Sequence, residues 1–224
     1  MNFIAVIPAR KNSKGIKFKN RHKINGETIT RLAIKKAIKF KCKYVILTSD
    51  DEYLCRENRD IAYIIKRPKN LSGDNACSFE VWRHAVLNLI NNHKLDYRNF
   101  STILLEPTSP NRKLIDLKRA TNFHLINKCS VLTVSKLNKS YSPEKIMEID
   151  KYDNIKFYRK NGLRYLQRQK IKDYYYRNGV CYSSYATEII RKNPKKSFYN
   201  NCKSIIINRY TVNLDEKEDL KNLI

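Results

Sequence analysis

The segment that follows the first apolar run of the chain carries a dense set of cations and polar groups. Residues Phe3 to Pro8 are apolar, which predicts a strand. The groups after it are Arg10, Ser13, Lys14, Lys17, Lys19 and Asn20. Ligands of doubly wound sheets bind beyond the carboxyl ends of strands, where backbone N–H groups and cations can hold phosphates. The turn has too few glycines for a Walker A loop or a dinucleotide fingerprint, so a phosphate site and an ordinary solvated loop both remain open.

Two further segments that follow predicted strands could form walls of the same site. Residues Glu106 to Pro110 follow the apolar run Ser101 to Leu105, and two prolines stiffen this turn. A second loop begins at Arg67 and ends at Ser78, where a helix is predicted to begin. Stiff turns suit a pocket wall, but they are also typical of rigid strand-to-helix connections. Ser78 could likewise be only the N-cap of the helix that follows it.

Asn213 and Asp215 alternate with apolar residues near the C-terminus. Residues two apart in an extended segment face the same side, so the amide and carboxylate oxygens are expected to lie together. Oxygen ligands of this kind could hold Mg²⁺. Asp215 could also be the N-cap of a terminal helix, and the two roles are compatible.

The chain is strongly basic, with a formal net charge of +25 from 46 Lys and Arg against 21 Asp and Glu. One interpretation is attraction to a polyanion such as RNA or DNA. The other is compositional drift in an A+T-rich genome, which agrees with 15 Tyr, 5 Gly and 6 Pro. The basic residues are spread along the chain, and no RNA-binding aromatic motif or basic arm is present. We therefore favour drift and expect no specific nucleic-acid partner.

Hydropathy and cysteine usage bear on location. No segment approaches the roughly 20 apolar residues needed to span a bilayer, and the N-terminal run is too short for a signal peptide. We expect no membrane insertion and a cytoplasmic location. The 6 cysteines form no CxxC pair and are not spaced like a zinc site. We expect reduced, mostly buried thiols.

Apolar runs alternate with longer amphipathic stretches along most of the chain. Strands are predicted at Phe3–Pro8, Lys43–Ser49, Ile61–Ile64, Ser101–Leu105, Cys129–Val134, Gly179–Ser183 and Ser204–Asn208. Helices are predicted at Ile29–Phe40, Ser78–Leu89, Leu114–Ile126, Ala186–Lys192 and Asp215–Leu223. This order predicts an α/β fold with a mostly parallel sheet and helices on both faces.

The alternation breaks after Val134. Residues 137–172 are polar, and the short alternating pieces Lys145–Ile149 and Ile155–Tyr158 predict the strands of a projecting hairpin. We therefore predict a nucleotide-binding core made of residues 1–136 and 173–224, with residues 137–172 inserted as an arm.

The motifs in these segments, taken in order, resemble those of the acylneuraminate cytidylyltransferase family, which makes CMP-sialic acid and related CMP-nonulosonates. The first match is the turn Ile7-Pro8-Ala9-Arg10-Lys11-Asn12-Ser13-Lys14-Gly15 with Lys19-Asn20. The others are Thr48-Ser49-Asp50-Asp51, Arg67-Pro68-Lys69-Asn70-Leu71-Ser72-Gly73-Asp74, Glu106-Pro107-Thr108-Ser109-Pro110, Arg168-Gln169, Asn178-Gly179-Val180-Cys181-Tyr182, and Asn213-Leu214-Asp215 with Asp219-Leu220. Each match alone is weak, but together they are specific and cover nearly the whole chain.

The resemblance implies a Rossmann-like, three-layer α/β/α nucleotidyltransferase whose arms mediate a homodimer. It implies that the 2-hydroxyl of a 2-keto sugar acid attacks the α-phosphorus of CTP, with Mg²⁺ as cofactor and pyrophosphate as leaving group. It assigns catalytic roles to Arg10, Lys19 and Asp215. The implied nucleotide site comprises Ala9, Arg10, Ser13, Lys19, Asn20, Arg67, Ala76 and Ser78. The implied sugar ligands are Glu106, Lys145 and Arg168, and the implied metal ligands are Asp215 and Asn213.

Two positions depart from the family pattern. Asn213 replaces the first aspartate of the metal pair, and a neutral amide binds Mg²⁺ more weakly than a carboxylate does. Glu106 replaces a glutamine, and an ionised carboxylate accepts hydrogen bonds without donating them. This favours an altered nonulosonate such as a legionaminic- or pseudaminic-type sugar. The alternatives are a nucleotidyltransferase for another sugar acid or nucleotide, a catalytically weak homologue, and a basic nucleic-acid-binding protein.

Overall fold

A seven-stranded sheet forms the centre of the computed structural model, which describes residues 1–13, 15–160, 167, 169 and 171–223. The strand order across the sheet is β11-β7-β10-β6-β1-β4-β5. These strands are β1 (Asn2–Pro8), β4 (Tyr44–Ser49), β5 (Tyr63–Lys66), β6 (Phe100–Leu104), β7 (Ser130–Lys136), β10 (Tyr175–Tyr185) and β11 (Cys202–Ile206).

Most neighbouring strands of this sheet are parallel, and β10 is the exception. Strand β1 is parallel to β4 and β6, β4 to β5, and β7 to β11. Strand β10 runs antiparallel to both β6 and β7, so that Tyr175 pairs with Lys136 and Tyr182 with Leu104. The start of β10 therefore lies at the carboxyl ends of its neighbours, which is the edge where ligands of such folds bind.

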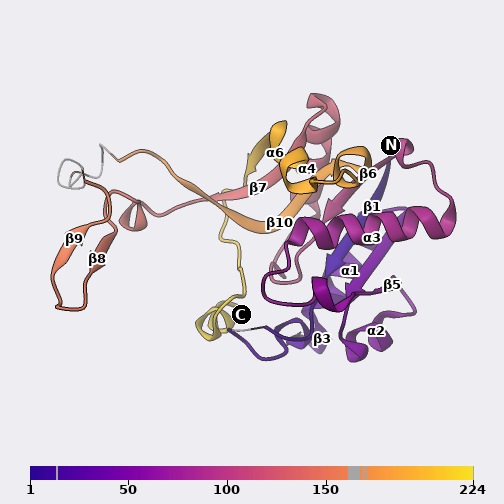
Figure 1. Ribbon diagram of the computed structural model, residues 1–224, viewed down its shortest axis with the longest axis horizontal. Helices are drawn as coiled ribbons and strands as arrows, with labels where there is room; N and C mark the ends of the chain where they lie inside the picture. The colour runs from indigo at the N-terminus through magenta and orange to yellow at the C-terminus, as the bar shows by residue number, and fades with distance from the viewer. Residues whose placement is uncertain (14, 161–166, 168, 170, 224) are drawn as a thin grey trace.

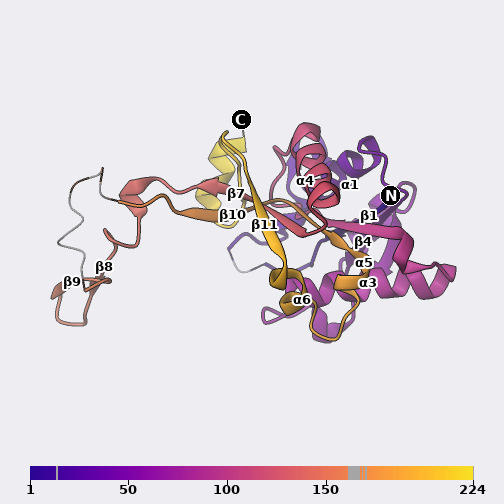
Figure 2. The same ribbon diagram turned by 90° about the horizontal axis from the view of Figure 1, so that it is seen from above.

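Helices cover both faces of the sheet and complete three layers, as Figure 2 shows. One face carries α1 (Ile29–Lys39), α2 (Glu52–Asn58) and α4 (Leu114–Asn127), and the other carries α3 (Ser78–His93), α5 (Ala186–Ile189) and α6 (Pro194–Asn200). Alternate residues of β1 enter the two cores, Ile4 and Val6 on one side and Ala5 and Ile7 on the other. The predicted α/β/α fold with a mostly parallel sheet is confirmed.

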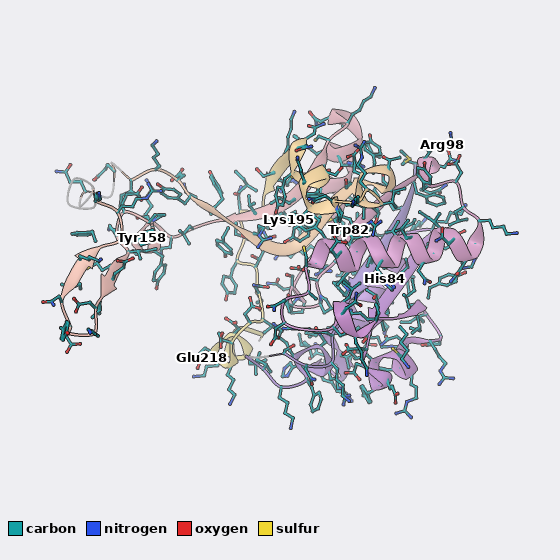
Figure 3. The ribbon with its side chains drawn as sticks, in the orientation of Figure 1. Trp82, His84, Arg98, Tyr158, Lys195 and Glu218 are labelled. Carbon is teal, nitrogen blue, oxygen red and sulfur yellow. The ribbon has the colours of Figure 1, made fainter. Side chains whose placement is uncertain are left out.

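A slender extension projects from this body, at the left of Figure 1. Its tip is an antiparallel pair of strands, β8 (Met147–Ile149) and β9 (Ile155–Phe157), which form a sheet of their own. Tyr158, labelled in Figure 3, lies on this extension and is 60% exposed. The predicted hairpin strands are thus confirmed. Strand β8 begins at Met147 instead of Lys145, and β9 ends at Phe157 instead of Tyr158.

Smaller elements connect the main ones. A two-stranded hairpin, β2 (Lys23–Ile24) and β3 (Glu27–Thr28), precedes α1. Short 3-10 helices lie at η1 (Lys19–Arg21), η2 (Lys69–Leu71), η3 (Tyr97–Asn99), η4 (Lys139–Tyr141) and η7 (Lys217–Leu223). Among the described residues, no helix has both the length and the apolar character that a membrane crossing needs.

Two predicted elements differ in the structure, and one helix was not predicted. The terminal helix expected at Asp215–Leu223 is the 3-10 helix η7, which begins at Lys217. The helix expected at Ala186–Lys192 ends at Ile189, because the chain turns into a second helix, α6, that the sequence analysis missed. Asn193 caps α6 through a hydrogen bond from the Lys196 N–H at 3.0 Å, and Pro194 occupies its first turn.

Candidate active site

A cavity of about 390 Å³ opens at the carboxyl ends of β1, β5 and β6 and at the start of β10. Its walls come from the turn after β1, the loop before α3, the turn after β6, β10 and the C-terminal segment. The predicted site residues that line it are Arg10, Ser13, Lys19, Asn20, Arg67, Ala76, Ser78, Glu106, Asn213 and Asp215. The fold therefore brings together most of the side chains that the sequence analysis selected.

Two predicted site residues do not line the cavity, and a third is not described by the structure. Ala9 is fully buried beneath the turn, where its N–H donates to the Thr48 carbonyl at 3.1 Å. Lys145 lies in the projecting extension and does not line this cavity. Arg168 lies outside the described residues, as does Lys14 of the turn.

Hydrogen bonds fix the turn after β1 at the edge of the cavity. The Asn20 side chain donates to the Arg10 carbonyl at 2.9 Å, and this amide is almost fully buried. The Arg10 guanidinium donates to Asp74 at 2.8 Å and to the Gly73 carbonyl at 3.2 Å. The turn is thus tied to the loop before α3, and Arg10 is held at the cavity wall.

The Lys19 ammonium donates to the Asp215 carboxylate at 2.9 Å, although the two residues lie at opposite ends of the chain. Figure 1 shows the C-terminal segment beside the turn that follows β1. An added Cβ on Gly15 would lie 2.1 Å from the Asp215 carbonyl oxygen, so this close approach requires glycine. The Leu214 N–H donates to the Thr108 carbonyl at 2.9 Å, which fixes the segment against the turn after β6.

The Asn213 amide also donates to the Asp215 carboxylate, which confirms that the two side chains face the same side. Asp215 does not cap the terminal helix, because η7 begins only at Lys217 and the Asp215 carboxylate accepts from Lys19 and Asn213 instead. No group of three or more His, Cys, Asp or Glu side chains placed to hold a metal occurs within the described residues. Asp215 is 58% exposed, so one carboxylate and one amide are available to a cation. This donor set fits Mg²⁺, which often takes one or two carboxylates together with substrate phosphates.

Arg67 and Ser78 form the part of the wall between β5 and α3. Arg67 is buried, and its guanidinium donates to the Thr48 carbonyl at 2.9 Å. Burial lowers the pKa of Arg67 to about 10, so it remains a cation at neutral pH. Ser78 is the first residue of α3, and the N-cap is Cys77. The capping role considered for Ser78 is therefore wrong, and its side chain lines the cavity.

Hydrogen bonds from the Arg112 side chain hold the turn from Glu106 to Ser109. This guanidinium is almost fully buried and donates to the Ser109 carbonyl at 3.2 Å, to the Gly179 carbonyl at 3.3 Å and to the Glu106 carbonyl. Three carbonyls from two different segments thus converge on one buried cation. Arg112 is a positioning residue that fixes the turn after β6 relative to β10.

A bulge at residues 178–181 shapes the part of β10 that faces the cavity, where the pairing with β7 shifts register. Asn178 is fully buried, accepts a hydrogen bond from Thr133 at 2.7 Å and donates to Ser135 at 3.0 Å. Gly179 has a φ of +66°, which glycine adopts without strain. Bulges beside a site change the direction of nearby side chains, and here the bulge brings Gly179 against Glu106.

Several residues that line the cavity were not predicted as site residues, and four of them have side chains that bear on the site. Arg177 and Tyr182 come from β10, Asp74 pairs with Arg10, and Val81 belongs to α3. The pKa of Arg177 is raised, chiefly by the neighbouring Tyr182 and further by Glu106. Asp74 could have been found, because it ends the motif that begins at Arg67. Tyr182 could have been found in the same way, because it ends the motif that begins at Asn178. Arg177 belongs to no motif, and its position depends on the direction of β10.

Comparisons with known proteins agree with this geometry. The model of the cytidylyltransferase family matches residues 4–223. The N-acylneuraminate cytidylyltransferase of Escherichia coli is 28% identical over 80% of this chain, which spans 41% of that protein's length. The CMP-N,N'-diacetyllegionaminic acid synthase of Legionella pneumophila is 29% identical over 96% of this chain and 90% of its own length.

The fold also matches a solved structure. A CMP:2-keto-3-deoxy-manno-octonic acid synthetase complexed with CTP superposes with a TM-score of 0.69 at 12% identity, over 100% of this chain and 97% of that one. At this identity the likeness concerns the fold alone. The family model, however, matches nearly the whole chain, and its match includes every segment that lines the cavity. The chain therefore belongs to the cytidylyltransferase family, a family of nucleotidyltransferase enzymes.

Proposed function

We propose that this protein transfers CMP from CTP to the 2-hydroxyl of a nonulosonic acid and releases pyrophosphate. The observation that carries the proposal is the single cavity that unites the cationic turn after β1 with Asp215, Glu106 and Arg177, in a chain of this family. The names of the Escherichia coli and Legionella relatives support the class of acceptor.

On the nucleotide side, Arg10, Ser13 and Lys19 would bind the triphosphate. Arg10 and Lys19 are cations already held at the cavity wall by Asp74 and Asp215. Phosphoryl transfer is accelerated mainly by positioning and by neutralising charge on the phosphate oxygens. Asn20, Arg67, Ala76 and Ser78 line the same cavity and would bind the cytidine.

Mg²⁺ belongs to this proposal as a cofactor. Asp215 and Asn213 would hold it, because they present the exposed oxygen ligands beside Lys19. When bound together with CTP, the ion would neutralise charge on the phosphates.

On the sugar side, Arg177 would bind the acceptor's carboxylate, because it is a cation on the wall of the cavity close to Glu106. Glu106 would face the hydroxyls of the acceptor. We further propose that Lys145 and Arg168 reach the acceptor from the arm of a second copy, since Lys145 is remote from the cavity of its own chain.

We propose a homodimer in which residues 137–172 act as an arm apart from a core of residues 1–136 and 173–224. The support is the concentration of exposed large apolar side chains on the extension: Tyr141, Ile146, Met147, Ile149, Tyr152, Ile155 and Tyr158. Apolar surface of this kind on a projecting segment marks an interaction site. A cytoplasmic location is also part of the proposal, supported by the six cysteines, which are all free thiols.

The function is tested by measuring pyrophosphate release with each of the four nucleoside triphosphates, Mg²⁺ and a panel of 2-keto sugar acids. We expect release with CTP and one or a few nonulosonic acids. Release with another nucleotide or another acid would replace the proposed substrate pair with the observed one. Absence of release with every pair, together with tight salt-sensitive binding of RNA, would establish the nucleic-acid-binding alternative instead.

A further inference from the structure

Seven charged side chains of the described residues line the cavity: the cations Arg10, Lys19, Arg67 and Arg177, and the carboxylates Asp74, Glu106 and Asp215. Two of the three carboxylates have a cation as their partner. Asp74 accepts from the Arg10 guanidinium at 2.8 Å, and Asp215 accepts from the Lys19 ammonium at 2.9 Å. The described part of the chain provides no hydrogen bond or ion pair to the Glu106 carboxylate, although Arg112 holds the backbone carbonyl of this residue.

The Glu106 carboxylate is held at the cavity wall by its neighbours. Its Oε2 lies 2.6 Å from the point that a Cβ of residue 179 would occupy, so it fills the space left by the missing side chain of Gly179. Arg112 donates to the backbone carbonyls of both residues. A half-buried carboxylate without a donor carries a free-energy cost until a ligand supplies one.

The charges around Glu106 leave its ionised form poorly stabilised. Burial raises the pKa of the Glu106 carboxyl, and the nearby Asp215 acts in the same direction. The cations Arg112, Arg177 and Lys19 act against this rise without cancelling it. A raised pKa means that the negative charge lacks a sufficient partner in the free protein.

Bound substrates would deepen this lack of positive charge. In the proposed transfer, Arg177 binds the carboxylate of the acceptor and Lys19 binds the triphosphate, so both cations then face anions of the substrates. Arg112 remains beside Glu106, but its hydrogen bonds go to three backbone carbonyls. The loaded site therefore has no positive charge that is available to the Glu106 carboxylate, unless the acceptor itself carries one.

We propose, on the basis of the transfer proposed above, that Glu106 selects a nonulosonic acid that carries a cationic nitrogen, which pairs with its carboxylate. An ammonium or an amidinium donates N–H groups and supplies the missing charge, and hydrogen bonds between charged groups are roughly twice as strong as neutral ones. A hydroxyl of the acceptor can occupy another lone pair of the carboxylate, but it leaves the charge unpaired. An amide carbonyl at the same point would be repelled, because an ionised carboxylate has no proton to donate to it.

The test compares two acids that differ in one group. One carries an acetamido substituent, and the other carries an acetimidoyl substituent on the same nitrogen, in which an NH₂⁺ group replaces the carbonyl oxygen. Such pairs are made at each nitrogen-bearing position of the sugar acid. The value of kcat/KM for each acid is measured with CTP and Mg²⁺ at neutral pH, for the wild-type protein and for Glu106→Gln, whose amide keeps the shape of the side chain without its charge.

We expect the wild-type protein to prefer the acetimidoyl acid about 100-fold at one position, as a hydrogen-bonded pair of charges implies. In Glu106→Gln the preference at that position should fall to within about threefold, because the amide is neutral and can also donate to a carbonyl. Each preference is a ratio measured on one preparation, so a partly unfolded variant does not change it. Where turnover is too slow to follow, the ratio of the binding constants of the two acids makes the same comparison.

Asp74→Asn is the matched control. It removes another carboxylate that lines the same cavity, but one that is paired with Arg10. This variant should keep the wild-type preference for the acetimidoyl acid. An equal loss of preference in Asp74→Asn and Glu106→Gln would overturn the inference, because the net charge of the cavity would then determine the choice of acceptor.

Two further results would overturn the inference while leaving the proposed transfer intact. One is a wild-type protein that turns over sugar acids without preferring the acetimidoyl form at any position. The other is a preference that survives unchanged in Glu106→Gln. A wild-type protein that releases no pyrophosphate with any acid of either kind would instead remove the proposed function, and this inference with it.

Discussion

The carboxylate of Glu106 occupies the space that a side chain on Gly179 would fill, with its Oε2 only 2.6 Å from the position of an added Cβ. The two residues belong to segments far apart in the sequence, the turn after β6 and the bulge of β10. One glycine thus determines where the carboxylate of the turn after β6 can point.

We predict that Gly179→Ala lowers kcat about 100-fold, because the new methyl group displaces the Glu106 carboxylate by the order of 1 Å. The variant should also lose about 1 kcal/mol of unfolding free energy, since a residue with a side chain is strained at a φ of +66°. Steady-state kinetics and urea denaturation measure the two effects. Gly26→Ala is the matched control, because Gly26 has a φ of +83° with no atom within 4 Å of an added Cβ. It should lose only the stability that the positive φ accounts for, and it should keep its activity; equal kinetic losses in both variants would refute the contact.

Lys19 tests the phosphate-binding role of the turn. Lys19→Met should lower kcat/KM for CTP about 100-fold or more, because it removes a cation that neutralises the phosphate oxygens. Lys17→Met is the control, since Lys17 belongs to the same turn, is exposed and does not line the cavity. Initial rates at varied CTP provide the measurement. Equal losses in the two variants would mean that only the overall charge of the turn matters.

Asn213 tests how the site holds a cation. Asn213→Asp places a second carboxylate beside Asp215, and the repulsion between them is relieved when a divalent ion binds. We expect about tenfold tighter binding of Mn²⁺, used as a probe for Mg²⁺ and followed by electron paramagnetic resonance with CTP present. Asp215→Asn should weaken it. Unchanged Mn²⁺ affinity in both variants would place the ion elsewhere.

The hairpin of β8 and β9 tests the proposed dimer. Ile149 and Ile155 pair across it and are 67% and 62% exposed. Replacing both with serine should convert dimers into monomers by light scattering, because it removes apolar contact area. The control replaces Glu148 and Lys156, which form the neighbouring cross-strand ion pair at 3.2 Å, with serine. A monomeric wild-type protein, or a dimer that survives the isoleucine changes, would contradict the proposal.

Much of this site could be predicted because its parts lie at predictable places along the chain. The turn after β1 follows an apolar run, and in a parallel sheet the end of such a run lies at the ligand-binding edge. Asn213 and Asp215 share a face because extended chains alternate. That Lys19 and Asp215 belong to one site was expected only from the family resemblance, since no local pattern relates two ends of a chain. Their ion pair is a finding of the structure.

The direction of β10 could not be predicted, for a physical reason. Whether a strand runs parallel or antiparallel to its neighbours depends on pairing with distant residues, and local hydropathy carries no information about it. Arg177 and Gly179 reach the cavity only because β10 runs antiparallel and bulges after Arg177. Helix α6 was missed because it is short and its first half carries Lys195 and Lys196, although Asn193-Pro194 is a helix-start signal.

The most direct test of the central claim follows the phosphorus atoms of CTP by ³¹P NMR while the protein, Mg²⁺ and a nonulosonic acid are present. We predict that the CTP resonances decline while pyrophosphate and one phosphodiester resonance of a CMP-sugar grow in equal amounts. Unchanged CTP with every acid tested, or formation of CMP and pyrophosphate without the phosphodiester, would contradict a transfer of CMP to the acceptor.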